Sequence, residues 1–158
     1  MLKIFVMINF IKHRLPEFLS ALFILLFIYT ATSKLLDIQR FQAILSQSPL
    51  IGHLAMVFSV LLPAFELLTA ALLFFPKTRT KGFGLSLIMM SVFTGYIAFM
   101  VVFSEKLPCS CGGVLSSMNW TEHLLFNIFF TIVAWLGYKE NKKIASHQSV
   151  TIPVQSHC

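Results

Sequence analysis

Four long apolar stretches dominate this sequence and determine the solvent in which it can fold. They lie at about residues 18–36, 53–75, 83–103 and 121–138. Each has about the 20 residues that an α-helix needs to cross the hydrocarbon core of a bilayer. Because lipid offers the backbone no hydrogen-bond partners, each stretch is predicted to be a helix. The predicted fold class is an all-α membrane protein, a bundle of four transmembrane helices.

Composition also points to lipid as the solvent. Hydrophobic residues make up 57% of the 158 residues and charged residues only 11%, whereas soluble domains carry about 25% charged residues. Phe alone occurs 17 times, which is more apolar surface than so short a chain can bury from water. Membrane lipid is therefore one predicted partner. Nucleic acid is not, because the basic residues form small groups that flank the spans.

The basic residues predict which ends of the spans face the cytoplasm, where Lys and Arg accumulate. Nine of the 12 fall in the N-terminal segment, the turn after the second span and the C-terminal tail: Lys3, Lys12, Arg14, Lys77, Arg79, Lys81, Lys139, Lys142 and Lys143. Both termini are therefore predicted to be cytoplasmic. The loop between the third and fourth spans is predicted to face the opposite side.

The chain is predicted to form one membrane domain, residues 1–145, followed by a disordered cytoplasmic tail at 146–158. The apolar stretch at 4–11 is followed by basic residues and by no small-residue cleavage site, so it is predicted to be retained and to lie at the interface. Residues 38–45 carry apolar side chains at helical spacing, which predicts a helix on the outer membrane surface.

The outer loop contains the residues best suited to chemistry, Cys109 and Cys111, followed by Gly112 and Gly113. Two cysteines at this spacing reach the Cα separation of a disulfide, roughly 4.4–6.8 Å, only with strain, and a strained disulfide is easily reduced. The two glycines leave the backbone free to bend and to admit a partner. The pair is predicted to be a catalytic or carrier dithiol. A structural disulfide is the first alternative.

The start of the fourth span adds groups that would assist such a pair. Asn119 and Glu122 have the spacing of a capping box, which would start a helix whose positive end favours a nearby thiolate. His123, one turn into the helix, can exchange a proton with a cysteine. Asn127 and Thr131 lie four and eight residues after His123, so a polar stripe is predicted to enter the bundle.

These residues also have simpler interpretations. Trp120 has the position of an interfacial aromatic anchor, and His123 and Asn127 can serve as interhelical hydrogen-bonding groups. Cys109, Cys111 and His123 together would supply three ligands for Cu(I) or Zn(II), although their spacing is not a standard zinc pattern. No metal site is predicted from them. Cys158 is predicted to be a free thiol in the tail.

Glu66 is a carboxylic acid near the middle of the second span. A charged residue there costs about 2.5–3.5 kcal/mol, so Glu66 is expected to face the bundle, either protonated or paired. Tyr29 and Ser33 of the first span are the expected partners. Lys34 is expected to snorkel toward the outer surface and not to reach Glu66. The functional alternative for Glu66 is a proton site or a contact for a quinone head group.

Several of these residues together resemble a known family. The first two spans are similar to the DoxX-like superfamily in two patterns: Tyr29-x-x-x-Ser33-Lys34-Leu35-x-Asp37-x-x-x-Phe41 and Pro63-x-x-Glu66. The outer loop and the fourth span resemble the methylamine utilisation protein MauE branch, particularly its versions from Bacteroidetes, in Pro108-Cys109-Ser110-Cys111-Gly112-Gly113, Trp120-Thr121-Glu122-His123-Leu124 and Asn127. The resemblance covers about residues 18–138.

The resemblance implies a redox-associated four-helix protein of the bacterial inner membrane. Such proteins help to form or shuttle disulfides, so a periplasmic thioredoxin-like or disulfide-bearing protein is the implied partner. The architecture also looks like that of DsbB and vitamin K epoxide reductase, which pass electrons to a quinone. This chain has only two outward-facing cysteines and no C-x-x-C pair, so quinone binding and autonomous enzymatic activity are left open.

The function predicted from these residues is thiol–disulfide exchange, or electron transfer to a periplasmic partner, through Cys109 and Cys111. One alternative is a non-enzymatic assembly factor or accessory subunit. Another is a membrane protein that binds a metal through Cys and His. A small transporter with Glu66 as proton relay is less favoured, because no inverted repeat is evident.

Overall fold

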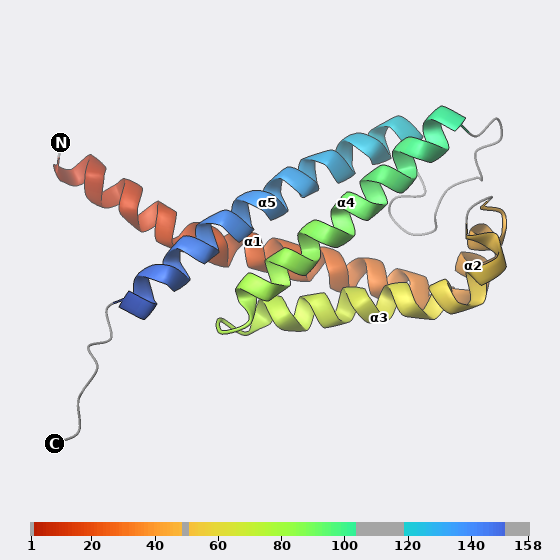
Figure 1. The fold of residues 1–158 in the computed structure, drawn as a ribbon, viewed down its shortest axis with the longest axis horizontal. Helices are drawn as coiled ribbons and strands as arrows, with labels where there is room; N and C mark the ends of the chain where they lie inside the picture. Colours follow the sequence, from red (N-terminus) through yellow and green to blue (C-terminus); the bar gives the residue numbers. More distant parts are fainter. Residues whose placement is uncertain (1, 49–50, 104–118, 151–158) are drawn as a thin grey trace, which may run out of the picture.

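The structure is a computed structural model that describes residues 2–48, 51–103 and 119–150 (Figure 1). All secondary structure within these ranges is helical. The elements are α1 (Leu2–Leu36), α2 (Ile38–Ser46), the 3-10 turn η1 (Gly52–Leu54), α3 (Ala55–Phe74), α4 (Arg79–Phe103) and α5 (Trp120–Val150). The prediction of an all-α membrane fold is confirmed at this level.

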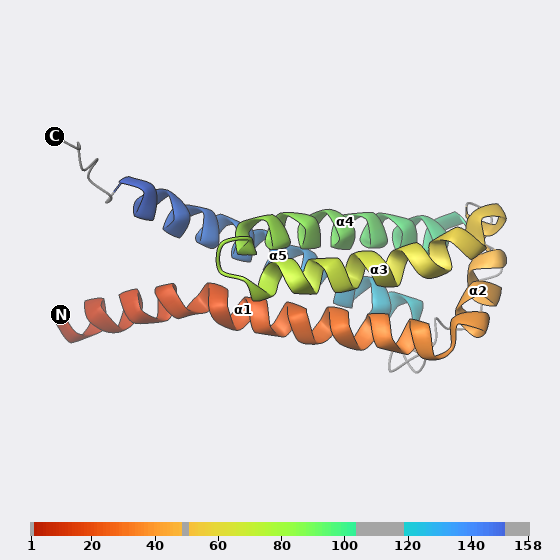
Figure 2. The same ribbon diagram turned by 90° about the horizontal axis from the view of Figure 1, so that it is seen from below.

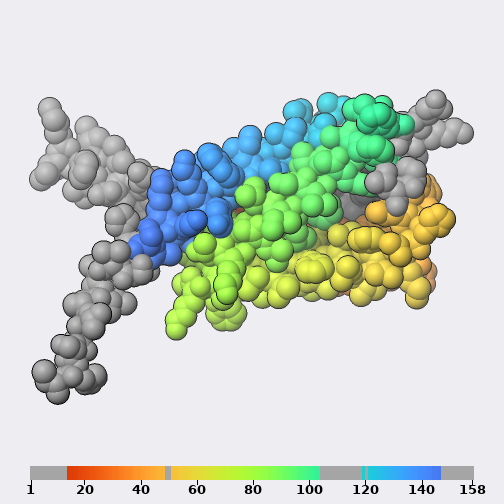
Figure 3. Space-filling model, viewed as in Figure 1, coloured from red at the N-terminus to blue at the C-terminus, as the bar shows by residue number. Residues whose placement is uncertain are grey.

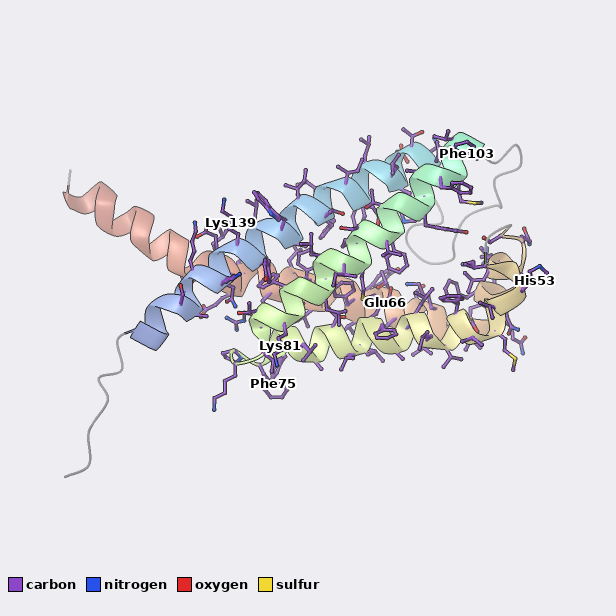
Figure 4. All side chains as sticks on the ribbon, in the orientation of Figure 1. His53, Glu66, Phe75, Lys81, Phe103 and Lys139 are labelled. Atoms are coloured by element: carbon purple, nitrogen blue, oxygen red, sulfur yellow. The ribbon has the colours of Figure 1, made fainter. Side chains whose placement is uncertain are left out.

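The four long helices alternate in direction along the molecule, and Figure 1 shows the α4–α5 pair inclined to the α1–α3 pair (Figures 1 and 2). α1 packs chiefly on α3, and α4 packs chiefly on α5. The α3–α4 turn lies toward the end where α1 begins and α5 ends, and α2 closes the opposite end, which we call the α2 end. In Figure 4, Phe75 and Lys81 mark the turn, whereas His53 and Phe103 mark the α2 end.

Three helical segments are long and apolar enough to cross a membrane, namely Arg14–Leu36, Gly52–Phe74 and Arg79–Phe103. The chain is therefore a multi-pass membrane protein. α5 is not among the three. Its first turns carry Glu122, His123 and Asn127, although Leu125, Phe129 and Ile132 expose more than half of their surface along one stripe of the same helix.

Two helices are longer than the spans expected from the sequence. α1 includes the apolar stretch at 4–11 and continues through Pro16 without interruption. α5 runs on to Val150, five residues beyond the boundary that the sequence analysis placed after residue 145. Helices can continue past a membrane border because their backbone hydrogen bonds are internal and do not depend on the solvent.

Aromatic side chains form the centre of the bundle. Phe23 of α1 is fully buried, and its ring meets the rings of Phe83 and Phe130 edge to face at centroid distances of 6.2 and 5.6 Å. Gly137 makes this packing possible, because a Cβ at that position would lie 2.5 Å from the Phe83 ring. Figure 3 shows the result of this packing from outside, with α4 against α5 on one face of the molecule.

The amphipathic helix predicted at 38–45 is confirmed as α2. Asp37 caps it by accepting a hydrogen bond from the Arg40 backbone N–H at 3.3 Å. Phe41 and Leu45 are buried in a cluster with Ala55 at the start of α3. α2 thus covers one end of the bundle with its apolar face.

Ser48, two residues after the end of α2, connects this end of the helix to α4. Tyr96 of α4 donates a hydrogen bond from its hydroxyl to Ser48 Oγ at 2.8 Å. Ser48 is buried, so this hydrogen bond is sheltered from water. The exit of α2 is therefore fixed to α4 by a polar contact as well as to α3 by apolar packing.

Candidate functional site

An ion pair between α1 and α3 lies inside the bundle. Lys34 Nζ donates to Glu66 Oε1 at 2.5 Å. The side chain of Glu66 is 3% exposed and that of Lys34 is 19% exposed. Figure 4 labels Glu66 on α3, where that helix runs beside α1. The pair therefore removes both charges from contact with the lipid.

This pairing corrects the expectation for Lys34. The sequence analysis expected Lys34 to snorkel outward and expected Tyr29 or Ser33 to satisfy Glu66. The partner in the structure is Lys34 instead. The flexible four-carbon side chain of lysine reaches from the end of α1 to the carboxylate on α3. The stem of Lys34 extends over the ring of Phe41, with Nζ 5.8 Å from its centroid.

The second carboxylate oxygen of Glu66 is buried and has no hydrogen-bond partner among the described residues. Thr30 lies beside the carboxylate, but its hydroxyl donates to the Phe27 carbonyl at 3.3 Å. Buried polar atoms are nearly always hydrogen-bonded, because leaving one unpaired costs about 1–3 kcal/mol. Glu66 Oε2 is therefore the one buried side-chain polar atom without a hydrogen-bond partner in the described part of the bundle.

One of the two hydrogen bonds of the predicted capping box is present at the start of α5. The Asn119 backbone N–H donates to Glu122 Oε2 at 2.9 Å, and the His123 N–H donates to the Asn119 carbonyl at 2.9 Å. Trp120 is the first residue of the helix. The capping box therefore starts α5 at the residue expected from the sequence.

The predicted polar stripe on α5 is confirmed as well. Asn127 is 4% exposed and donates from Nδ2 to the His123 carbonyl at 2.9 Å. Thr131 donates to the Asn127 carbonyl, and its hydroxyl lies 3.1 Å from the hydroxyl of Thr94 on α4. The stripe therefore runs along the contact between α4 and α5.

Lys34 also acts electrostatically on His123 of α5. The His123 side chain is half-buried, and the ammonium charge of Lys34 is close enough to act on the ring electrostatically. The charge of Lys34 on α1 therefore acts both on the carboxylate of α3 and on the imidazole of α5. Sequence reasoning selected all three residues but did not predict that Lys34 would interact with the other two.

A pocket of about 330 Å³ opens beside Lys34, where α1 ends and α2 begins. Three of the polar residues selected from the sequence line it: Tyr29, Ser33 and Lys34. The sequence analysis missed the pocket itself. Its shape depends on the angle at which α2 leaves α1, and no sequence pattern used above specifies that angle.

The predicted reactive loop lies outside the described residues, and this includes Cys109, Cys111, Gly112 and Gly113. The tail residue Cys158 also lies outside them. The structure does describe the two helix ends that the loop connects, Phe103 and Trp120, and both are at the α2 end (Figure 1). Across the described ranges, no three His, Cys, Asp or Glu side chains form a group able to hold a metal ion. A site that combines both cysteines with His123 extends beyond those ranges.

Comparison with known proteins gives one family match. The family model described as methylamine utilisation protein MauE matches residues 12–139. That range includes the spans, the Lys34–Glu66 pair, the loop and the polar stripe of α5. No curated protein and no solved structure matches the chain significantly.

Proposed function

The chain belongs to the methylamine utilisation protein MauE family, and from that premise we propose that it is a redox-associated membrane protein that exchanges disulfides through Cys109 and Cys111. The observation that carries the proposal is the construction of the α2 end. A capped helix start with His123 in its first turn follows the cysteine loop directly. The loop therefore joins the bundle at a helix start whose imidazole is under the electrostatic influence of Lys34, the cation that is paired with Glu66.

The exchange is a two-electron transfer between the cysteine pair and a partner protein. A thiolate of one cysteine attacks a disulfide of the partner and forms a mixed disulfide, which releases one partner thiolate. The second cysteine then attacks the first, which closes the Cys109–Cys111 bond and releases the partner as a dithiol. The reverse sequence reduces the pair and oxidises the partner. The partner is a periplasmic thioredoxin-like or disulfide-bearing protein.

The groups at the start of α5 assist by holding charge and protons. The unpaired N–H groups in the first turn of a helix favour a nearby thiolate. His123 accepts the proton that a thiol loses and returns it when the thiol forms again. Glu122 fixes the helix start through the capping hydrogen bond, so it acts as a positioning residue.

The proposed topology has four spans, with both termini in the cytoplasm of a bacterium and the cysteine loop in the periplasm. The fourth span is residues 121–138 of α5. Its exposed stripe of Leu125, Phe129 and Ile132 supports this placement, because such a stripe is stable against lipid and not against water. The basic residues of the α3–α4 turn and the last part of α5 lie toward the end where α1 begins, as the positive-inside rule requires.

Trapping of a mixed disulfide tests the proposal. Cys109→Ser and Cys111→Ser each remove one of the two attacking thiols. The variant that keeps the first attacking thiol should accumulate a covalent complex with the partner, which a reductant cleaves. Alkylation in intact cells should also find the wild-type pair in both redox states. Cys158→Ser serves as the control and should leave both results unchanged.

The proposal fails if neither variant captures a partner and the wild-type pair stays in one redox state. The double Cys→Ser variant then separates the remaining roles. An accessory subunit or assembly factor would keep its function in that variant, because its contacts would be made by the helices.

A further inference from the structure

The pocket at the corner between α1 and α2 lies at the border of the membrane. Its walls come from the last two turns of α1 and the first turn of α2: Tyr29, Thr32, Ser33, Lys34, Leu36, Asp37, Arg40 and Phe41. Leu36 is also the last residue of the span Arg14–Leu36. The pocket therefore lies at the depth where lipid head groups meet the hydrocarbon region.

Two opposite charges in the pocket wall are available to a ligand. Lys34 is already neutralised by Glu66. Asp37 and Arg40 form no ion pair with each other or with any other described side chain, and both are exposed. Among the described residues, the Asp37 carboxylate accepts one hydrogen bond, from the Arg40 backbone N–H. A guanidinium and a carboxylate thus face one pocket without a side-chain counter-ion.

Two hydroxyl groups add hydrogen-bonding capacity. Most serines and threonines elsewhere in the bundle donate to a carbonyl of their own helix, as Thr69 and Ser86 do. Within the described part of the chain, the hydroxyls of Thr32 and Ser33 have no recorded hydrogen bond. Both residues line the pocket beside the two charged residues.

The remaining walls are apolar. The side chain of Leu36 is 83% exposed, and Phe41 presents an aromatic surface that is otherwise buried against α3. A water-soluble ion gains nothing from these walls, whereas the glycerol and first methylene groups of a lipid would be shielded from water by them. The combined chemistry is that of a charged head group attached to an apolar body.

We propose that this pocket binds the head group of a zwitterionic phospholipid that carries a primary ammonium, such as phosphatidylethanolamine. Arg40 and the hydroxyls of Thr32 and Ser33 hold the phosphate, since a guanidinium fork matches phosphate oxygens. Asp37 accepts hydrogen bonds from the ammonium. The assignment is independent of the cysteine chemistry, because none of these residues takes part in it.

The charges predict an order of preference among lipids. Phosphatidylethanolamine satisfies both Arg40 and Asp37. Phosphatidylglycerol offers a phosphate but no cation for Asp37. Phosphatidylcholine has a quaternary ammonium that cannot donate a hydrogen bond. Phosphatidylethanolamine should therefore bind most tightly of the three.

Native mass spectrometry of the full chain in detergent, titrated with each lipid, measures these preferences. Arg40→Gln should weaken the binding of phosphatidylethanolamine and phosphatidylglycerol alike, by about tenfold, which is the loss of one charged hydrogen-bonding contact. Asp37→Asn should weaken phosphatidylethanolamine alone by a similar factor. Asparagine caps a helix as well as aspartate does, so this variant removes the charge and keeps the start of α2. Lys77→Gln removes an exposed cation at the far end of the bundle and should change nothing.

Three outcomes would overturn the assignment. In the first, the three lipids bind equally to the wild-type chain. In the second, both Asp37→Asn and Arg40→Gln bind phosphatidylethanolamine as the wild type does. In the third, soluble glycerophosphoethanolamine competes as well as the lipid at equal concentration, which would make the ligand a soluble phosphate ester. Each pocket variant has its own expected pattern, because only Arg40→Gln should also weaken the binding of phosphatidylglycerol. Misfolding of one variant therefore leaves the other as a complete test.

Discussion

At the scale of single residues, the Lys34–Glu66 pair is the contact with the largest energetic consequence. Each partner neutralises the charge of the other and so lowers the free-energy cost of burying it in the bundle. Removal of one partner from a buried pair typically costs about 3–5 kcal/mol, whereas replacement of both by apolar residues is often neutral. The pair is therefore expected to behave very differently in single and double variants.

Lys34→Met should lower the free energy of unfolding by about 3 kcal/mol, at the lower end of that range because Glu66 can take up a proton. The double variant Lys34→Met, Glu66→Met should recover most of the loss. Unfolding of the purified protein in bicelles by steric trapping measures both. Lys81→Met, at an exposed lysine, is the control. A double variant less stable than Lys34→Met would contradict the compensation.

The cap of α5 gives a second prediction at this scale. Glu122→Ala removes the hydrogen bond from the Asn119 backbone N–H and should cost about 1 kcal/mol. Glu122→Gln keeps a side-chain acceptor and should cost less. Hydrogen exchange of the amides in the first turn of α5 reports the difference. Equal exchange rates in both variants would mean that the cap does not hold the helix start.

At the scale of the elements, the contact between α4 and α5 depends on small residues. Gly137→Ala would place a Cβ 2.5 Å from the buried ring of Phe83, and overpacking of this kind costs about 1–3 kcal/mol. Gly95→Ala on α4 meets nothing within 4 Å and should be neutral or slightly stabilising, since alanine is the better helix former. The thermal unfolding temperature should therefore fall in Gly137→Ala and stay the same or rise slightly in Gly95→Ala. A Gly137→Ala protein as stable as wild type would show that the ring can move.

The elements were also what the sequence predicted best. Runs of apolar residues located the four long helices, helical spacing located α2, and Asn119 with Glu122 located the start of α5. The lengths of α1 and α5 were underestimated because polar residues beyond a span are compatible with helix. The Lys34–Glu66 pair and the pocket were not predicted. Both depend on how α1 and α3 lie against each other and on the turn at Asp37, which local patterns do not describe.

At the scale of the whole molecule, the distribution of charge predicts an orientation that labelling can test. Cys109 and Cys111 should react with a membrane-impermeant maleimide added to intact spheroplasts after reduction. A Lys77→Cys substitution, made in a chain without its other cysteines, should react only after the membrane is opened. The expectation follows from the basic residues near the α3–α4 turn. Labelling of position 77 in closed spheroplasts would reverse the proposed topology.

The ion pair between α1 and α3 also bears on the order in which the chain enters the bilayer during synthesis. Lys34 precedes Glu66 by 32 residues. The Lys34 side chain therefore reaches the edge of the membrane before Glu66 leaves the ribosome. An acid that entered alone would be penalised by the hydrocarbon. The first two long helices should therefore insert together as a hairpin, each neutralising the charge of the other, before the second pair arrives.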